Sequence, residues 1–277
     1  MTYGNRHGTT ILTHSILLFA SVILFTIPIG VLWNRITTEQ NQLINYKPHV
    51  AALVLARGGS KAVPRKNLAE IQNTTLLRRT LNTINDFGLF QDVWVSTDDD
   101  EIAAEAELGG AKVFRRSDQT ASDTATSLSA LKEFSMYHQK VDIFAVIQCT
   151  SPFLTVDYLG KAYRMTVQQK FDSVFSVTRS HKLRWTLDSS GHLHPLNFDV
   201  SKRPRRQDWG GEYVENGMFY FAHRKLVVND KLQGGKLGVV VIPVNRSLEI
   251  DTEFDLKAAR LLASLHDSPK NITENKL

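Results

Sequence analysis

The chain has 277 residues, of which 42% are hydrophobic and 22% are charged. It is long enough for one sizeable α/β domain with an appendage, or for two small domains, and it can bury a core. Lysine and arginine outnumber aspartate and glutamate by 33 to 28, and the resulting net charge of +5 favours an anionic partner or substrate. Cys149 is the single cysteine, which excludes an intrachain disulfide.

The N-terminal segment is strongly apolar. Residues 8–34 contain no Asp, Glu, Lys or Arg, and residues 15–33 are mostly apolar. At about 1.5 Å per residue, a helix of this length matches the hydrocarbon core of a bilayer. We expect residues 1–35 to form a signal anchor or transmembrane segment and residues 36–48 a stem, which would place the remaining chain in the Golgi or endoplasmic reticulum lumen. A cleaved signal and a buried globular helix are the alternatives.

After the stem, short apolar runs alternate with segments of helical periodicity. The apolar runs predict strands at residues 50–56, 92–97, 111–116, 141–148 and 172–178. The periodic segments predict helices at residues 75–87, 99–108, 127–138 and 156–169. This alternation predicts an α/β fold with a mostly parallel sheet flanked by helices. Ligands of such sheets bind at the carboxyl ends of the strands.

The alternation breaks at residues 181–209. Residues 184–196 have the character of a hairpin, and a basic run follows at residues 202–206. We interpret residues 179–210 as an inserted oligomerisation arm. Two further strands and a closing helix complete a domain of residues 49–266, followed by a tail of residues 267–277. These last elements are predicted at residues 217–222, 237–244 and 253–264.

Residues 55–67, LARGGSKAVPRKN, follow the first predicted strand directly. The two glycines allow the backbone to approach an anion closely, and Arg57, Lys61 and Lys66 supply positive charge beside it. The Walker pattern and the G-x-G-x-x-G fingerprint are both absent from the sequence. The loop is therefore a candidate phosphate site of another kind, and a solvated basic loop is the alternative.

Three more loops are expected at the same edge of the sheet or close to it. Residues 115–127, RRSDQTASDTATS, begin with arginines and carry hydroxyl groups that suit a ribose or a base edge, unless these groups only cap helices. Gln148 ends a predicted strand, where its amide can read a base or a sugar hydroxyl. Glu249 and Asp251 lie two residues apart, so both carboxylates point to one side of an extended segment and suit Mg²⁺ on a polyphosphate. Asp251 or Thr252 can also cap the following helix, and the two interpretations are compatible.

Seven motifs occur in order between about Val50 and Arg260. They are LARGGSKAVPRKN, VWVSTDDDEIA, RRSDQTASDTATS, IQCTSP, FDSVFSV, KRPRRQDWGGEYVENGMFYF and EIDTEFDL. In this order they resemble the cytidylyltransferases that make CMP-sialic acid, and the animal enzymes in particular. Because the chain ends soon after its closing helix, we expect no counterpart of the phosphatase-like C-terminal domain of vertebrate relatives.

The resemblance implies a fold, an assembly and a reaction. The fold is that of the nucleotide-diphospho-sugar transferases, which is Rossmann-like, and the assembly is a homodimer or homotetramer with an exchanged arm. The reaction joins CTP and N-acylneuraminate (sialic acid) to give CMP-N-acylneuraminate and pyrophosphate, with Mg²⁺ (or Mn²⁺) as cofactor.

The resemblance also implies roles for individual residues. The positions that match nucleotide contacts are Arg57, Asn67, Arg116, Ser127 and Gln148. The positions that match catalytic residues are Lys61 and Lys66, which face phosphates, and Arg206, which has Arg203 and Gln207 beside it.

Two of the matched positions depart from the family pattern. Asp251 matches a metal-binding aspartate, but Glu249 stands where the family has a second aspartate. Ala62 replaces a glycine, which matters if that position needs a positive φ angle.

Two other functions compete with this interpretation. A Golgi type II glycosyltransferase would share the anchor, and residues 98–100 contain a D-x-D pattern, although these aspartates also favour a helix start. A nuclear or nucleic-acid-binding protein would use the basic run at residues 202–206 as a localisation signal or phosphate patch. The anchor argues against a nuclear location, and we expect no nucleic-acid partner.

Overall fold

The computed structural model describes residues 47–266, of which residues 48–266 belong to one compact unit. The predicted anchor, nearly all of the predicted stem and the predicted tail lie outside the described residues. Within residues 47–266, no helix has both the length and the apolar character needed to cross a membrane.

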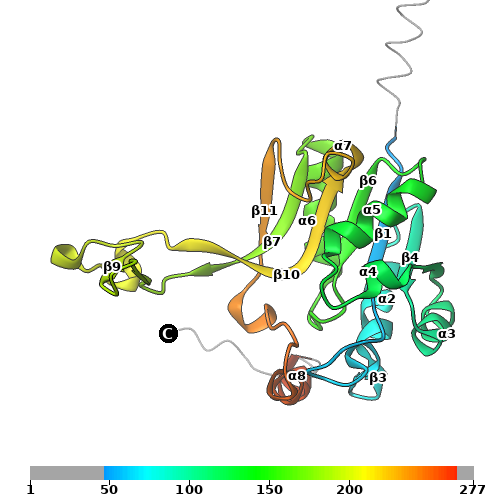
Figure 1. The fold of residues 1–277 in the computed structure, drawn as a ribbon, viewed down its shortest axis with the longest axis horizontal. Helices are drawn as coiled ribbons and strands as arrows, with labels where there is room; N and C mark the ends of the chain where they lie inside the picture. The colour runs from blue at the N-terminus through cyan, green and yellow to red at the C-terminus, as the bar shows by residue number, and fades with distance from the viewer. Residues whose placement is uncertain (1–46, 267–277) are drawn as a thin grey trace, which may run out of the picture. The chain divides into compact units, whose positions relative to one another are not determined.

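A seven-stranded sheet forms the centre of the described chain (Figure 1), and its strand order is β11-β7-β10-β6-β1-β4-β5. Strand β10 runs antiparallel to β6 and β7, whereas the other neighbouring strands pair in parallel. The predicted mostly parallel α/β fold is therefore confirmed. The strands are β1 (Val50–Leu55), β4 (Asp92–Thr97), β5 (Lys112–Arg115), β6 (Ile143–Ile147), β7 (Ser173–Ser180), β10 (Glu212–His223) and β11 (Leu237–Val241).

Several helices begin where a hydroxyl or carboxylate side chain caps them, as at Thr75, Asp99 and Thr126. Helix α2 ends at Gly88, whose φ of 65° suits a residue without a Cβ atom. Two short helices, α4 and α7, were not predicted. The helices are α2 (Leu76–Phe87), α3 (Asp100–Leu108), α4 (Asp118–Ala121), α5 (Ser127–Tyr137), α6 (Val156–Tyr163) with a π-helical continuation η2 (Arg164–Gln168), α7 (Arg224–Val227) and α8 (Glu253–His266).

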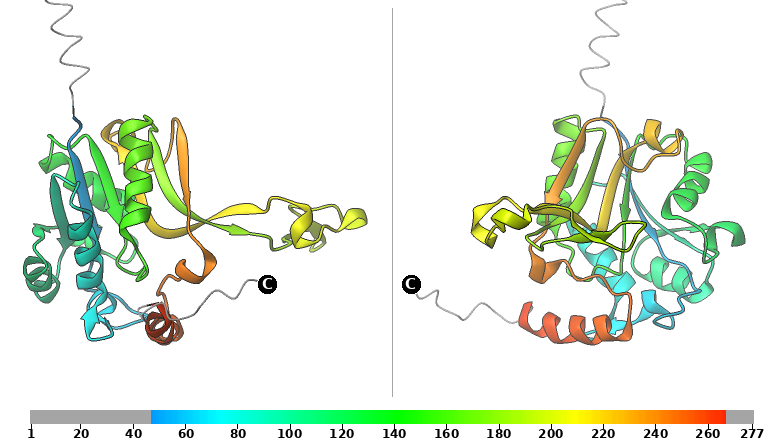
Figure 2. Two further views of the ribbon diagram at one scale, coloured as in Figure 1. Left: turned by 180° about the vertical axis from the view of Figure 1, so that it is seen from behind. Right: turned by 60° about the vertical axis from the view of Figure 1, so that its left-hand side comes forward.

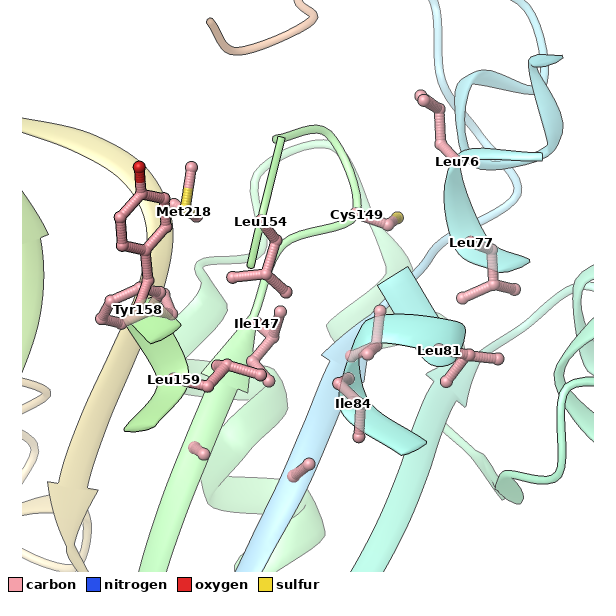
Figure 3. Close-up of a cluster of buried hydrophobic side chains, with 14 of the residues drawn as sticks. Leu76, Leu77, Leu81, Ile84, Ile147, Cys149, Leu154, Tyr158, Leu159 and Met218 are labelled. Carbon is pink, nitrogen blue, oxygen red and sulfur yellow. The ribbon is translucent and has the colours of Figure 1, made fainter. Parts of the chain in front are cut away.

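Alternation along the central strands divides the core into two layers. In β1, Val50, Ala52 and Val54 face one cluster of buried side chains, and Ala51 and Leu53 face the other. Side chains of α2, α3, α6 and α8 cover the first face, and those of α5 and α7 cover the second. Figure 3 shows Leu76, Leu77, Leu81 and Ile84 of α2 and Leu159 of α6 among the side chains of the first layer. Because both faces are covered, these strands are apolar throughout.

Between β7 and β10 the chain leaves the sheet, in the region predicted at residues 179–210. We call residues 181–211 the arm. It contains the hairpin of β8 (Trp185–Leu187) and β9 (Leu193–Pro195) and the 3-10 turns η3 (Val200–Lys202) and η4 (Arg206–Asp208). Figures 1 and 2 show it extending away from the sheet. Several of its apolar side chains are exposed, including Leu187, Leu193 and Val200 at 60–65%.

Three shorter elements complete the described chain. They are the small hairpin of β2 (Glu70–Ile71) and β3 (Thr74–Thr75), the 3-10 turn η1 (Lys66–Leu68) in the basic loop, and the 3-10 turn η5 (Val244–Arg246). The loop that carries η1 leaves the carboxyl end of β1, and Figure 1 shows α8 beyond the carboxyl ends of the central strands. This edge of the sheet holds the candidate site.

Candidate active site

A cleft of about 520 Å³ opens at the carboxyl ends of the strands. Its walls come from the loops after β1, β5 and β6 and from the segment before α8. Seven predicted site residues line it: Arg57, Lys61, Lys66, Asn67, Arg116, Ser127 and Asp251. The tertiary structure thus gathers most of the predicted residues in one cavity, and their individual roles stay predictions.

One of the two glycines that follow β1 is engaged within the protein. The Gly58 amide donates to the Asp98 carboxylate at 2.9 Å, so it is directed there rather than at an anion in the cleft. A Cβ atom at position 58 would lie 2.8 Å from Asp99 Oδ2, so a side chain would displace the cap of α3. The described non-glycine residues with positive φ do not include Ala62, so its replacement of a glycine requires no unusual backbone.

The cations of the basic loop divide into three groups. Arg57 Nη1 and Lys61 Nζ both contact the Asp123 carboxylate, at 2.6 and 2.5 Å. Lys66 Nζ lies 3.2 Å from Asp251 Oδ1, and its side chain is 19% exposed. Arg65 pairs instead with Glu101 of α3. Arg57, Lys61 and Lys66 therefore present positive charge to the cleft.

Asn67 is a buried residue that fixes the path of this loop. Its Nδ2 donates to the Arg57 carbonyl at 2.9 Å, and its Oδ1 accepts from Cys149 Sγ at 3.1 Å. Burial raises the pKa of the Cys149 thiol to about 12, so this group remains a neutral donor. Asn67 therefore ties the loop to the end of β6, whatever contact its side chain makes with a nucleotide.

Arg116 is a buried guanidinium in the cleft wall, 8% exposed. It donates through Nη2 to the Ser96 carbonyl, while its Nε has no partner anywhere in the described part of the chain. Burial lowers its pKa to about 10, which leaves it charged at neutral pH. A buried donor without an acceptor is costly. A ligand that places a hydrogen-bond acceptor near Arg116 Nε would therefore satisfy this donor.

The segment before α8 resolves the two interpretations of Asp251. Thr252 caps the helix, because its Oγ1 accepts from the Asp255 amide at 3.2 Å and the Asp255 carboxylate accepts from the Thr252 amide at 2.8 Å. Asp251 is therefore not required as the cap, and its carboxylate, 66% exposed, faces Lys66 across the cleft.

Glu249, two residues before Asp251, is half-buried and is not among the residues that line the cleft. Gly217 has a φ of +72°, and a Cβ atom there would lie 2.8 Å from Glu249 Oε2, so this glycine makes room for the carboxylate. Burial and the charge of Asp251 raise the pKa of Glu249 above its ordinary value. The Asp251 charge is thus unfavourable for an ionised Glu249, and a cation between the two carboxylates would offset this repulsion.

The remaining predicted residues differ in their positions. Ser127 begins α5, and its hydroxyl has no hydrogen-bond partner among residues 47–266. Gln148 follows β6, and its Oε1 accepts from Thr150 of the cleft wall at 3.4 Å. Arg203, Arg206 and Gln207 belong to the arm, and none of the described residues that line the cleft comes from the arm. This chain therefore does not bring its own arm to the cleft.

Asp123 and Thr150 are among the polar residues of the cleft that were not predicted. Both lie inside segments that were recognised, Asp123 between α4 and α5 and Thr150 after β6. The aspartates of the D-x-D pattern are each engaged elsewhere. Asp98 accepts from Gly58, Asp99 caps α3, and Asp100 pairs with Arg115 at 2.6 Å.

Comparisons with known proteins agree with this geometry. A family model described as Cytidylyltransferase matches residues 51–266. N-acylneuraminate cytidylyltransferase A of Danio rerio is 42% identical over 214 residues, covering 76% of this chain and 50% of that protein. Pseudaminic acid cytidylyltransferase of Campylobacter jejuni is 31% identical over 228 residues, covering 78% of this chain and 97% of that protein.

A solved structure shares the fold. CMP:2-keto-3-deoxy-manno-octonic acid synthetase complexed with CTP aligns with a TM-score of 0.60 at 15% identity, over 78% of this chain and 99% of that chain. The chain spans about half the length of the Danio rerio relative.

The family match covers nearly every residue that the structure describes, including the whole cleft. The chain therefore belongs to the cytidylyltransferase family.

Proposed function

We propose that this enzyme transfers CMP from CTP to the anomeric hydroxyl of N-acylneuraminate, releasing pyrophosphate. The observation that carries the proposal is the contact of Lys66 with Asp251, residues 185 positions apart, in a cleft lined by further cations. The similarity to the N-acylneuraminate enzyme of Danio rerio supports the choice of sugar. The same similarity favours this reaction over glycosyl transfer from a nucleotide sugar and over binding of nucleic acid.

The reaction brings two anions together. The sugar hydroxyl oxygen forms a bond to the α-phosphorus while the bond to pyrophosphate breaks, so negative charge develops on the equatorial and leaving oxygens. Lys66, which pairs with Asp251, is suited to bind the α-phosphate. Lys61 and Arg57 are suited to bind the phosphates that leave as pyrophosphate. Cations already fixed in place stabilise that charge without reorganisation at the moment of reaction.

Asp251 and Glu249 fit a divalent cation such as Mg²⁺ or Mn²⁺. Their oxygens are hard ligands, and a cation would offset the burial and the repulsion from Asp251 that raise the pKa of Glu249. The described residues contain no group of three His, Cys, Asp or Glu side chains that could hold a metal, so phosphate oxygens and water would complete the coordination. When bound, the ion would neutralise phosphate charge.

A pyrophosphate-release assay tests the proposal. The purified protein is given CTP, Mg²⁺ and one sugar acid at a time: N-acetylneuraminate, pseudaminic acid or 2-keto-3-deoxy-manno-octonic acid. We expect release and a CMP-sugar product with N-acetylneuraminate. A folded protein that forms no product from it would contradict the proposal, and a product from another acid alone would keep the cytidylyl transfer and change the sugar.

We propose that the enzyme is a homo-oligomer in which the arm of one subunit completes the cleft of another. Two observations support this: Arg203 and Arg206 lie away from the cleft of their own chain, and the arm exposes apolar side chains such as Leu187 and Leu193. In this arrangement Arg206 would offer its guanidinium to an anion in the partner's cleft.

Mixed oligomers distinguish this arrangement from an arm that acts on its own chain. We expect Lys66→Ala and Arg206→Ala subunits each to be weakly active alone. Co-expressed, they form a heterodimer with one cleft that combines an intact core with an intact arm, so activity recovers to about half per heterodimer. If the arm served its own chain, both clefts would stay impaired and the mixture would show no recovery.

We propose that residues 1–35 anchor the chain in the membrane with residues 49–266 in the Golgi or endoplasmic reticulum lumen. The apolar segment at residues 15–33 supports this. The full-length protein is then expected in the membrane fraction, with the folded domain protected from added protease until detergent is present. Nuclear staining of the full-length protein would contradict the proposal and return attention to the basic run at residues 202–206.

A further inference from the structure

We infer that Asp123 is an internal counter-anion of the cleft, which holds the phosphate-binding cations until a phosphate displaces it and which competes with pyrophosphate after the reaction. The inference rests on the proposed function, since it concerns the same cations. It adds a residue that controls how tightly the cleft retains its anions.

The geometry places one carboxylate on two cations. Asp123 Oδ1 accepts from Arg57 Nη1 at 2.6 Å, and Asp123 Oδ2 lies 2.5 Å from Lys61 Nζ. Both of its oxygens are therefore engaged by side chains of a loop 62 to 66 residues away in sequence. All three residues line the cleft, so the carboxylate lies where these cations would otherwise meet a phosphate.

The charges make the contact replaceable. Asp123 carries one negative charge against two positive charges, and the pairing with Lys61 and Arg57 lowers the pKa of its carboxyl group, so it is ionised at neutral pH. The side chains are exposed to solvent, at 43% for Asp123, 34% for Arg57 and 83% for Lys61. Exposed ion pairs of this kind are weak. A polyphosphate carries several charges and can displace the carboxylate.

Lys66 and Asp251 form a contrasting pair in the same cleft. Lys66 is 19% exposed, and Asp251 is placed by the segment that leads into the capped helix α8. Asp123 instead lies in the exposed loop between α4 and α5, where the neighbouring Ser122 and Thr124 are also exposed. The Asp123 carboxylate can therefore leave its partners without disturbing the core.

Two explanations predict opposite results for Asp123→Asn. If the carboxylate competes with phosphate, its neutralisation removes both the competing contact and the repulsion, and anions bind more tightly. If it only holds Arg57 and Lys61 in position, the variant binds anions more weakly. Asp118 provides a matched control, because it is exposed, lies in the neighbouring helix α4 and has no side-chain partner within the described residues.

The test is calorimetric binding of CTP and, separately, of pyrophosphate to the wild type, Asp123→Asn and Asp118→Asn. We expect Asp123→Asn to bind both ligands about five- to tenfold more tightly, with a difference that shrinks as salt is added. Asp118→Asn should stay within about twofold of the wild type. Pyrophosphate should also inhibit turnover of Asp123→Asn at lower concentration. A melting temperature near that of the wild type checks that each variant is folded.

The outcomes separate this inference from the proposed function. Unchanged or weaker pyrophosphate binding in Asp123→Asn overturns the counter-anion inference, even if the wild type makes CMP-sialic acid. Tighter pyrophosphate binding supports it, even if the preferred sugar or nucleotide proves different. If neither ligand binds to any of the three proteins, both the inference and the proposed function are overturned.

Discussion

Replacing Asp251 by asparagine should lower turnover on the order of a hundredfold while leaving the fold intact. The carboxylate is 66% exposed and is not required as the cap of α8, because Thr252 provides the cap, so the domain should fold without it. Its loss removes the ion-pair partner of Lys66 and the exposed member of the carboxylate pair proposed to hold the cation. The measurement is the pyrophosphate-release rate over a range of Mg²⁺ concentrations.

Glu253→Gln is the matched control for this variant. Glu253 is exposed, two residues away, and its substitution removes the same charge without touching the cleft. We expect its turnover to stay within about twofold of the wild type. If Asp251→Asn were equally active at every Mg²⁺ concentration, neither the metal nor Lys66 would depend on this carboxylate, and the proposed catalytic arrangement would be wrong.

Replacing Lys66 by alanine should lower turnover well over tenfold, and about a hundredfold if the amine stabilises charge only in the transition state. The ammonium group is mostly shielded from solvent in the cleft wall, where a charge acts on a phosphate more strongly than in water. The structure is expected to tolerate the loss, because Asp251 is exposed and remains solvated without its partner.

Steady-state kinetics with CTP and N-acetylneuraminate separate binding from chemistry in this variant. A fall in kcat together with kcat/KM indicates contact made in the transition state, whereas a rise in KM alone indicates that Lys66 only binds CTP. Lys257→Ala, which removes an exposed lysine of α8 away from the cleft, is the control. Normal turnover of Lys66→Ala would remove this residue from the mechanism.

The predicted strands and helices were accurate wherever burial follows a simple period. Strand β1 is apolar on both faces because two layers of helices cover it, and this leaves a continuous run in the sequence. Strand β10 was predicted too short, because its pairing with β7 shifts register between Glu215 and Tyr220. Gly217 lies within this irregularity. Its lack of a Cβ atom leaves space for the Glu249 side chain, which is distant in sequence.

The class of fold, the cation-rich loop after β1 and the resemblance to the family could be predicted without a structure, because periodic burial and ordered motifs are local properties of a chain. The tertiary structure decided which charges meet: Lys66 with Asp251, and Arg57 and Lys61 with Asp123. Packing also directs the Gly58 amide to Asp98 and keeps the arm away from the cleft of its own chain. These pairings join residues 40 to 185 positions apart, so only the packing of the sheet and its loops brings them within reach.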